Sequence, residues 1–265
     1  MKIQGAENVA RTALQALLLK NDGNSIRNLL NLRPTEPALR NVIKYALSFS
    51  DIQTGVKKTL ALMDEARKKI IFNGSQLIKN NMTIFTHCHS STVLDILKSA
   101  KSQGKKFQVL NTETRPNFQG RITASELAKS KIPVTMFIDS AANSAIKQSD
   151  LFLFGADVIT AEGNVINKIG NKMFAEMAEK YDVPSYACSI AFKLDSETLK
   201  GKIPVLEERN PDEVWKNRPP GVKISNVIFE KIEERLITGI ISEFGILPPS
   251  SFVVEVKKRY PWLID

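Results

Sequence analysis

The sequence predicts an α/β protein in which an N-terminal helical domain is followed by a parallel-sheet domain. Two observations support this prediction. Up to about residue 73 the apolar residues recur at helical spacing. From residue 82 onward, short apolar runs alternate with amphipathic stretches of helix length, which is typical of a parallel sheet built from strand–helix–strand units. We therefore expect a helical domain over residues 1–73 and an α/β domain over residues 74–265.

The first 73 residues contain four helical stripes separated by short breaks. Two of the breaks, at residues 21–23 (Asn-Asp-Gly) and 33–35 (Arg-Pro-Thr), are rich in residues that favour turns. The stripes are formed by Val9, Leu14, Leu17 and Leu18; by Ile26, Leu29 and Leu30; by Leu39, Val42, Ile43, Ala46 and Leu47; and by Val56, Leu60, Met63 and residues 66–70. This pattern predicts about four helices.

The second part of the chain contains five short apolar runs, which we expect to be the strands of the sheet. The runs are residues 82–85 (MTIF), 107–110 (FQVL), 134–138 (VTMFI), 151–154 (LFLF) and 185–192 (SYACSIAF). Residues 227–244 follow a helical pattern that is closed by Gly245 and by Pro248-Pro249. The sequence therefore predicts a helix over 227–244.

The composition is typical of a globular protein and argues against a membrane-spanning or disulfide-rich chain. With 43% hydrophobic residues over 265 positions, the chain has enough apolar side chains for a sizeable core. No apolar run approaches the roughly 18–20 residues of a membrane-spanning helix. Two cysteines cannot build a disulfide framework, so we expect free thiols in a reducing cytoplasm.

The net charge of +9 has two interpretations. One is nucleic-acid binding, and the other is a basic cytosolic protein with an anionic substrate. The basic residues are scattered along the chain, and the sequence has no aromatic stacking motif and no helix-turn-helix signature. We therefore favour a small molecule that carries phosphate, since charge alone speaks only to association and solubility.

Polar and reactive side chains follow the expected strands. Ligands of an open parallel sheet bind beyond the carboxyl ends of its strands. The first strand is followed by Cys88 between two histidines, the fourth by Asp157 and the fifth by Lys193. The alternative is that strand ends are polar because they face solvent. A zinc site is unfavourable, because His87 and His89 would need further ligands that the sequence does not supply nearby.

The residues after Cys88 predict an anion-binding site. Ser90, Ser91 and Thr92 open a helical pattern, and Asp95 lies three residues after Thr92, as in a capping box. The free N–H groups of that first turn would bind a phosphate, and the helix dipole would lower the pKa of Cys88. Cys88 would then be a base or a nucleophile. The alternative is a buried, inert cysteine.

Asp157 follows a wholly apolar strand, so we expect burial to raise the pKa of its carboxyl. A protonated aspartic acid that faces a thiolate is an acid–base pair suited to moving protons. The alternative is an aspartate that caps a loop. The sequence has no Gly-rich dinucleotide motif and no P-loop, so neither dinucleotide nor nucleoside-triphosphate chemistry is indicated.

Several motifs resemble one protein superfamily along nearly the whole chain. They are THCHS (86–90), NTETRPNFQGRITA (111–124), FIDSA (137–141), FGADVITAEGNVINKIG (154–170) and ITGIISEFGILPPS (237–250). This superfamily contains the alpha, beta and delta regulatory subunits of eukaryotic translation initiation factor 2B, methylthioribose-1-phosphate isomerase and archaeal ribose-1,5-bisphosphate isomerase. The compact length and the sequence AFKLD at residues 191–195 favour the archaeal isomerase branch.

The resemblance implies a helical domain joined to a Rossmann-like domain, assembled as a homodimer or a dimer-based hexamer, with no metal or redox cofactor. It implies an aldose–ketose isomerase of AMP metabolism that converts ribose 1,5-bisphosphate to ribulose 1,5-bisphosphate. In this resemblance Cys88 takes a proton from C2 of the sugar and Asp157 acts as the acid. The matching substrate-binding positions are Gln4, Gly5, Ala6, Arg33, Ser90, Ser91, Thr92, Asn167, Lys168 and Lys193.

Two positions depart from the isomerases. Gln4 replaces the arginine of an Arg-Gly-Ala motif, which removes a bidentate phosphate donor. His89 stands where the isomerases tend to have asparagine, and we expect it to donate a hydrogen bond and to add positive charge when protonated. The alternative function is a non-catalytic, initiation factor 2B-like regulatory subunit that binds a nucleotide or sugar phosphate and contacts initiation factor 2. The joint presence of Cys88, Asp157 and Lys168 favours the enzyme.

Overall fold

Four helices form the N-terminal part of the chain. The computed structural model describes residues 5–32 and 35–264. The helices are α1 (Ala6–Leu19), α2 (Gly23–Leu32), α3 (Pro37–Leu47) and α4 (Ile52–Leu77), in agreement with the four apolar stripes. Asp51 precedes α4, and its carboxylate accepts hydrogen bonds from the N–H groups of Gln53 and Thr54. Residue 73, where we expected the domain boundary, lies inside the last turns of α4.

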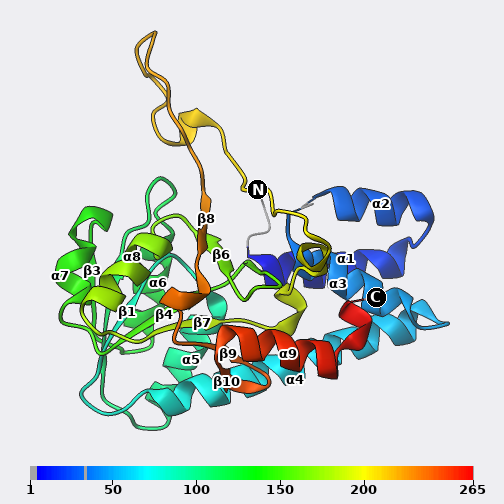
Figure 1. Cartoon of the computed structure of the whole chain (residues 1–265), viewed down its shortest axis with the longest axis horizontal. Coiled ribbons are helices and arrows are strands. Elements are labelled where there is room, and N and C mark those ends of the chain that lie inside the picture. Colours follow the sequence, from blue (N-terminus) through cyan, green and yellow to red (C-terminus); the bar gives the residue numbers. More distant parts are fainter. Residues whose placement is uncertain (1–4, 33–34, 265) are drawn as a thin grey trace.

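A seven-stranded sheet forms the centre of the remaining chain (Figure 1). Its order is β10-β9-β7-β4-β1-β2-β3. The strands are β1 (Thr83–Thr86), β2 (Gln108–Thr112), β3 (Val134–Phe137), β4 (Leu151–Gly155), β7 (Ser185–Cys188), β9 (Gly239–Ser242) and β10 (Gly245–Leu247). All neighbouring pairs are parallel except β9 and β10. Each of the five apolar runs overlaps a strand of this sheet, and the predicted α/β fold class is confirmed.

The strand order creates a crevice at the carboxyl ends of β1 and β4. The chain runs outward from β1 through β2 to β3 and then returns to the other side of β1 to form β4 and β7. The connections on the two sides diverge at this point, where open α/β sheets bind their ligands. Phe85 pairs with Phe152 and Thr86 pairs with Leu153, so the segments that follow β1 and β4 leave the sheet side by side.

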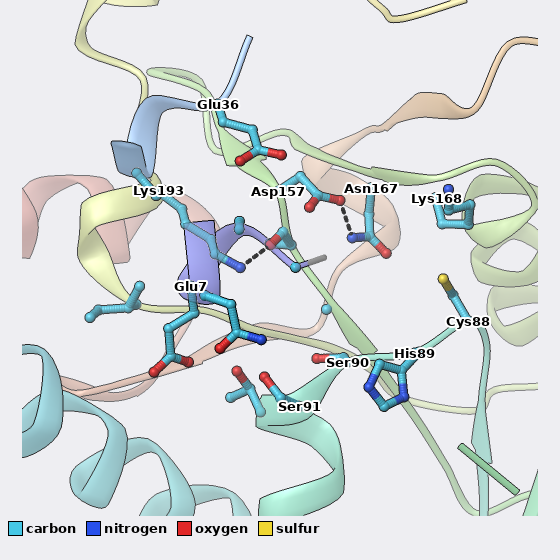
Figure 2. A pocket seen from close by; sticks show the side chains of 18 of the residues that line it. Glu7, Glu36, Cys88, His89, Ser90, Ser91, Asp157, Asn167, Lys168 and Lys193 are labelled. Carbon is cyan, nitrogen blue, oxygen red and sulfur yellow. Dashed lines mark hydrogen bonds between the residues drawn. The ribbon is translucent and has the colours of Figure 1, made fainter. Parts of the chain in front are cut away.

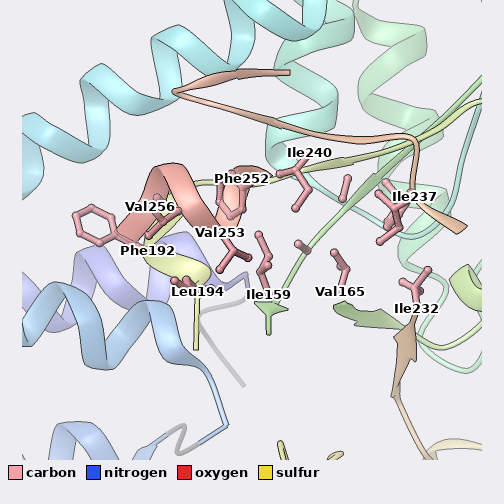
Figure 3. Close-up of a cluster of buried hydrophobic side chains, with 14 of the residues drawn as sticks. Ile159, Val165, Phe192, Leu194, Ile232, Ile237, Ile240, Phe252, Val253 and Val256 are labelled. Atoms are coloured by element: carbon pink, nitrogen blue, oxygen red, sulfur yellow. The ribbon is translucent and has the colours of Figure 1, made fainter. Parts of the chain in front are cut away.

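Helices cover both faces of the sheet, because its central strands are apolar on both sides. Ile84 and Leu151 belong to one buried cluster, with side chains of α5 (Ser91–Ser102) and α6 (Gln119–Lys129). Phe85 and Phe152 belong to the other cluster, with side chains of α7 (Ala142–Ile146), α8 (Asn171–Lys180) and α9 (Pro249–Arg259). The second cluster, drawn in part in Figure 3, continues into α1 and α3. The N-terminal helices therefore share a core with the sheet.

The helix predicted over residues 227–244 is wrong. This stretch contains β8 (Phe229–Ile232) and β9, and β9 forms an antiparallel hairpin with β10. β8 pairs with β6 (Val165–Lys168) in a second sheet of order β5-β6-β8, in which β5 is Val158–Ile159. Ile240 and Ile241 are buried in the two different clusters, on opposite faces of β9. A strand that is buried on both faces has the same apolar content as a buried helix, and spacing alone does not separate them.

The segment that leads into β8 projects from the body of the molecule (Figure 1). It carries exposed apolar side chains, among them Ile203, Val205 and Trp215, which are 88%, 74% and 50% exposed. No helix in the described ranges is both long and apolar enough to cross a membrane.

Candidate active site

Cys88 lies in the loop that follows β1, with a backbone φ of 67° that side chains other than glycine adopt rarely. Two threonines hold this conformation. The N–H group of Cys88 donates to Oγ1 of Thr114 at 3.0 Å, and Oγ1 of Thr123 donates to the carbonyl oxygen of Cys88 at 2.8 Å. The thiol then lies 3.4 Å from Oε1 of Gln119, the first residue of α6, to which it donates a weak hydrogen bond. The loop thus presents the sulfur at the crevice.

Burial raises the pKa of the Cys88 thiol to about 11. The positive charge of Lys168 and a backbone hydrogen bond from His89 act in the opposite direction, but they do not offset the loss of water around the sulfur. Our expectation that the dipole of α5 would lower this pKa is therefore wrong. Cys88 is only 8% exposed, and the free energy lost when its thiolate is removed from water is larger than the stabilisation that a helix N-terminus provides.

The first turn of α5 lies beside Cys88 and carries the expected serine and threonine residues. Ser90 is the cap of this helix, and its Oγ accepts from the N–H group of Val93 at 3.4 Å. The predicted capping box between Thr92 and Asp95 does not form, because the helix begins at Ser91 and Thr92 lies inside it, and Asp95 instead pairs with Arg67 of α4. The first N–H groups of a helix have no carbonyl partner within the helix, and a helix start of this kind favours anions.

Gly155, the last residue of β4, allows the start of α5 to approach the sheet. A Cβ atom at this position would lie 3.0 Å from Oγ of Ser90 and 3.7 Å from Nδ2 of Asn167. Any larger residue would therefore push the helix cap away from the crevice. The absence of a side chain at Gly155 brings the start of α5 next to the residues that follow β4.

Asp157 is half-buried and is held by a chain of amides. Nδ2 of Asn167 donates to Oδ2 of Asp157 at 2.8 Å, and Nδ2 of Asn171 donates to Oδ1 of Asn167 at 2.6 Å. Asn167 and Lys168 end β6, and each is 8% exposed. Lys168 lies over the ring of Phe229 of β8, with 5.0 Å between Nζ and the ring centre. The small sheet therefore brings an amide and an ammonium group to the crevice.

Lys193 approaches from the opposite side on the short 3-10 turn Ala191–Lys193. Its Nζ donates to the carbonyl oxygen of Ala156, directly before Asp157. Two buried side chains hold the turn. Nδ2 of Asn41 in α3 donates to the carbonyl oxygens of Phe192 and Leu194, at 2.8 and 2.9 Å. The carboxylate of Glu243, which follows β9, accepts from the N–H group of Ala191. The position of Lys193 thus depends on both parts of the fold.

Cys88, Asp157 and Lys193 line one cavity of about 560 Å³ (Figure 2), which is within the usual size range of small-molecule sites. It is bounded by the starts of α1 and α5, the ends of β4 and β6, and the turn that carries Lys193. The predicted residues that line it are Gly5, Ala6, Cys88, Ser90, Ser91, Thr92, Asp157, Asn167, Lys168 and Lys193. Gln4 and Arg33, which the resemblance also implied, lie outside the described residues.

Sequence reasoning missed several charged and polar residues of the cavity. Gln119 was noted only as part of a motif, and Arg67 and Glu7 belong to helices that were read for their apolar stripes. Arg67 binds the carboxylates of Glu7 at 2.7 Å and of Asp95. Burial opposes ionisation of Glu7, but Arg67 and Arg11 outweigh it and hold its pKa below the ordinary value. No local spacing could have paired residues so far apart in the chain.

His87 also lines the cavity, is 2% exposed, and makes hydrogen bonds through both ring nitrogens. Nε2 donates to the carbonyl oxygen of Ile169 at 3.0 Å, and Nδ1 is bonded to Oγ1 of Thr112. Burial lowers its pKa to about 4, although the carboxylate of Asp139 lies 4.0 Å from Nδ1. His87 is therefore neutral and supports the site. Among the described residues, no group of three or more histidine, cysteine or carboxylate side chains is arranged to hold a metal ion.

The fold and the cavity define an α/β protein with a polar ligand site at the point where its strand order reverses. The initiation factor 2 subunit family matches residues 2–249. The ribose 1,5-bisphosphate isomerase of Methanocaldococcus jannaschii is 34% identical over 99% of this chain and 93% of that protein. The methylthioribose-1-phosphate isomerase of a Thermoanaerobacter species is 35% identical over 85% of this chain and 72% of that protein. A crystal structure of the translation initiation factor eIF-2B of Pyrococcus horikoshii superposes with a TM-score of 0.83 at 26% identity, covering 96% of this chain and 94% of that one.

The chain therefore belongs to the initiation factor 2 subunit family, as its motifs indicated. The expectation of an enzyme is confirmed at the level of this class, because relatives that match most of the chain are isomerases.

Proposed function

We propose that this protein is an aldose–ketose isomerase that converts ribose 1,5-bisphosphate to ribulose 1,5-bisphosphate, with Cys88 as the base and Asp157 as the acid. One observation carries the proposal. The two residues follow the adjacent parallel strands β1 and β4, at the point where the strand order reverses, and both line the same cavity. The M. jannaschii relative, which matches nearly the whole chain, has this activity in its name.

The raised pKa of Cys88 suits both halves of a proton transfer between neighbouring carbons. As a thiolate it is a strong base toward C2 of the sugar, and as a thiol it returns the proton to C1. The resting thiol donates to Gln119, and Lys168 and the N–H group of His89 favour the thiolate once it forms. Burial keeps water away from the sulfur, so the transferred proton stays between sugar and enzyme.

Asp157 is the proposed proton donor to the ring oxygen of the furanose. The phosphate on the anomeric carbon of the sugar keeps the furanose ring closed unless the ring oxygen receives a proton. Oδ2 of Asp157 is occupied by Asn167, which leaves Oδ1 as the oxygen for the substrate. Lys193 binds the carbonyl oxygen of the preceding residue, which fixes the backbone on which this carboxyl stands.

The phosphate groups are the proposed ligands of the cationic and N–H groups of the cavity. Ser90, Ser91 and Thr92 form the start of α5, and Lys168 and Lys193 supply charge on the facing wall. Gly5 and Ala6, at the start of α1, are proposed to bind through their backbone, because a helix N-terminus favours anions. Gln4 and Arg33 remain proposed contacts from the resemblance alone.

The proposal is tested by turnover of α-ribose 1,5-bisphosphate, with formation of ribulose 1,5-bisphosphate followed directly. Cys88→Ser and Asp157→Asn are expected to lower kcat by at least roughly 100-fold while substrate binding, measured by calorimetry, persists. Cys188→Ser is the matched control, since Cys188 is 1% exposed and does not line the cavity. Full activity in Cys88→Ser would refute the assigned base.

We also propose that the chain assembles as a homodimer or a dimer-based hexamer. The exposed apolar side chains Ile203, Val205 and Trp215 on the projecting segment, and Met136 on the edge strand β3, support a protein surface as their partner. Light scattering after size-exclusion chromatography measures the mass in solution. A monomer at micromolar concentration would contradict this proposal.

A non-catalytic regulatory subunit is the second candidate, and the close superposition with the P. horikoshii protein named translation initiation factor eIF-2B favours it. Such a subunit would bind a nucleotide or a sugar phosphate in the same cavity and would contact translation initiation factor 2. Binding of these ligands without turnover by the wild-type protein would favour it over the isomerase.

A further inference from the structure

His89 lies in the wall of the cavity, between Cys88 and the cap of α5 (Figure 2). Its ring is half-buried against α5 and α6. Two charged groups face it from these helices, Lys98 of α5 and Glu126 of α6, and they pair with each other at 3.0 Å. Their charges act on the imidazole in opposite directions, so neither helix fixes its protonation state alone.

The hydrogen bonds of Thr123 determine which nitrogen of His89 carries the proton. Thr123 is 2% exposed, and its hydroxyl has a single hydrogen. That hydrogen is directed to the carbonyl oxygen of Cys88 at 2.8 Å, because a carbonyl can only accept. The contact of 3.2 Å between Nδ1 of His89 and Oγ1 of Thr123 must then have Nδ1–H as the donor.

This assignment leaves Nε2 of His89 as a bare acceptor in the neutral ring. Burial lowers the pKa of His89, which favours the neutral form at neutral pH. Within the described parts of the chain, no hydrogen bond is found for Nε2. The expectation that His89 offers the ligand a donor and a positive charge is thus replaced by the opposite: the donor is used within the protein, and the free atom accepts.

We propose that Nε2 of His89 accepts the hydrogen bond of a substrate hydroxyl and takes its proton during the reaction. This inference rests on the proposed isomerase function, and it adds a residue to the pair Cys88 and Asp157. His89 is then a catalytic residue, and Thr123 is the residue that positions it.

Proton balance explains the need for a third group. In the isomerisation the C2–H bond and the bond between C1 and the ring oxygen break, and a C1–H bond and a hydroxyl on the former ring oxygen form. Cys88 enters the reaction as the minor thiolate form, takes the proton from C2 and returns it to C1, so it is again a thiolate at the end of the cycle. Asp157 gives a proton to the ring oxygen. The hydroxyl on C2 must lose its proton as the C2 carbonyl forms, and His89 is the acceptor. The imidazolium then passes this proton to solvent or back to Asp157, which restores the enzyme.

The tautomer is tested without any activity measurement. The chain has only two histidines, so nitrogen-15 NMR of the labelled wild-type protein and of His87→Gln assigns the His89 ring unambiguously. Near neutral pH we expect a protonated Nδ1 and an unprotonated Nε2. Thr123→Val removes the hydroxyl that accepts from Nδ1–H of His89, so a mixture of the two tautomers is expected. Thr123→Ser keeps the hydroxyl and should resemble the wild type. A protonated Nε2 in the wild-type protein would overturn the proposal.

The catalytic role is tested by the pH dependence of turnover. His89→Gln keeps a polar side chain but cannot take a proton, and kcat should fall by roughly 100-fold or more, with a smaller change in KM. The decline of kcat/KM toward acid pH should become less steep in this variant, because protonation of His89 no longer contributes to it while protonation of Cys88 still does. Turnover in which both kcat and the acid limb are unchanged would overturn the role of His89 alone. Absence of turnover by the wild-type protein would overturn the isomerase itself and the role of His89 with it.

Discussion

Acidification is expected to destabilise this protein through one buried histidine. His87 is 2% exposed and neutral, and its two ring nitrogens are both used in hydrogen bonds within the protein. Its Nε2–H group donates to the carbonyl oxygen of Ile169, so Nδ1 must accept from Thr112 in the neutral ring. Protonation would place a charge in an apolar environment, edge-on to Phe174 at 4.9 Å, and would remove the bond from Thr112.

The size of the effect follows from the two pKa values. Burial lowers the pKa of His87 from 6.5 to about 4 in the folded protein. The unfolded chain therefore binds a proton that the folded chain does not bind between these values. The contribution of neutral His87 to stability is fully present above pH 6.5 and is lost as the pH falls to 4. A difference of about 2.5 pH units, at about 1.4 kcal/mol for each unit, corresponds to roughly 3 kcal/mol.

Urea unfolding followed by circular dichroism at several pH values between 4 and 7.5 measures this loss. The control is His87→Gln, which keeps a donor and an acceptor but does not titrate. Carboxylates remote from His87 contribute equally to both proteins and cancel in the comparison, and the charge of Asp139, 4.0 Å from Nδ1, is already included in the lowered pKa of His87. The wild-type protein is expected to lose roughly 3 kcal/mol more than the variant over this range. Parallel curves for the two proteins would refute the assignment of a neutral, buried His87.

Three further predictions concern the cavity and its support. In a Cys188→Ser background, Cys88, with a pKa of about 11, should react with iodoacetamide at pH 8 roughly 200-fold more slowly than an ordinary free cysteine. A reaction rate that stops rising with pH below pH 9 would contradict this. Gly155→Ala places a Cβ atom 3.0 Å from Oγ of Ser90, so phosphate affinity measured by calorimetry should fall roughly tenfold, and unchanged affinity would show that the helix cap does not contact the anion. Asn41→Ala leaves two buried carbonyl oxygens without their donor and should cost roughly 1–3 kcal/mol in urea unfolding, which an unchanged midpoint would disprove.

The parts of the fold that depend on local pattern could be predicted from the sequence. The N-terminal helices follow from the spacing of their apolar residues, and the parallel strands follow from apolar runs separated by amphipathic stretches. Cys88 and Asp157 could be chosen together because each follows such a strand, and the parallel topology brings strand ends to one edge. Strands β8 and β9 were mistaken for a helix, because Ile240 and Ile241 are buried on opposite faces of β9, which gives the stretch the apolar content of a buried helix.

The properties of the site that depend on tertiary packing could not be predicted. The pKa of Cys88 is governed by burial, and the residues that bond to it, Thr114, Gln119 and Thr123, lie 26 or more positions further along the chain. Asp95, which we expected to cap the start of α5, instead pairs with Arg67 of α4, 28 positions earlier in the chain. The tautomer of His89 depends on Thr123, which lies 34 residues further along the chain. Each of these effects depends on a contact between residues that lie far apart in the sequence, so a local sequence pattern cannot predict it.

The central claim is that the cavity performs proton transfer on a sugar phosphate with Cys88 as the base. The most direct measurement is phosphorus-31 NMR of α-ribose 1,5-bisphosphate incubated with the wild-type protein and, separately, with Cys88→Ser. We expect the wild-type protein to form ribulose 1,5-bisphosphate, and the variant to bind the substrate without forming product. Substrate that binds to the wild-type protein and stays unchanged, or equal product from both proteins, would contradict the account.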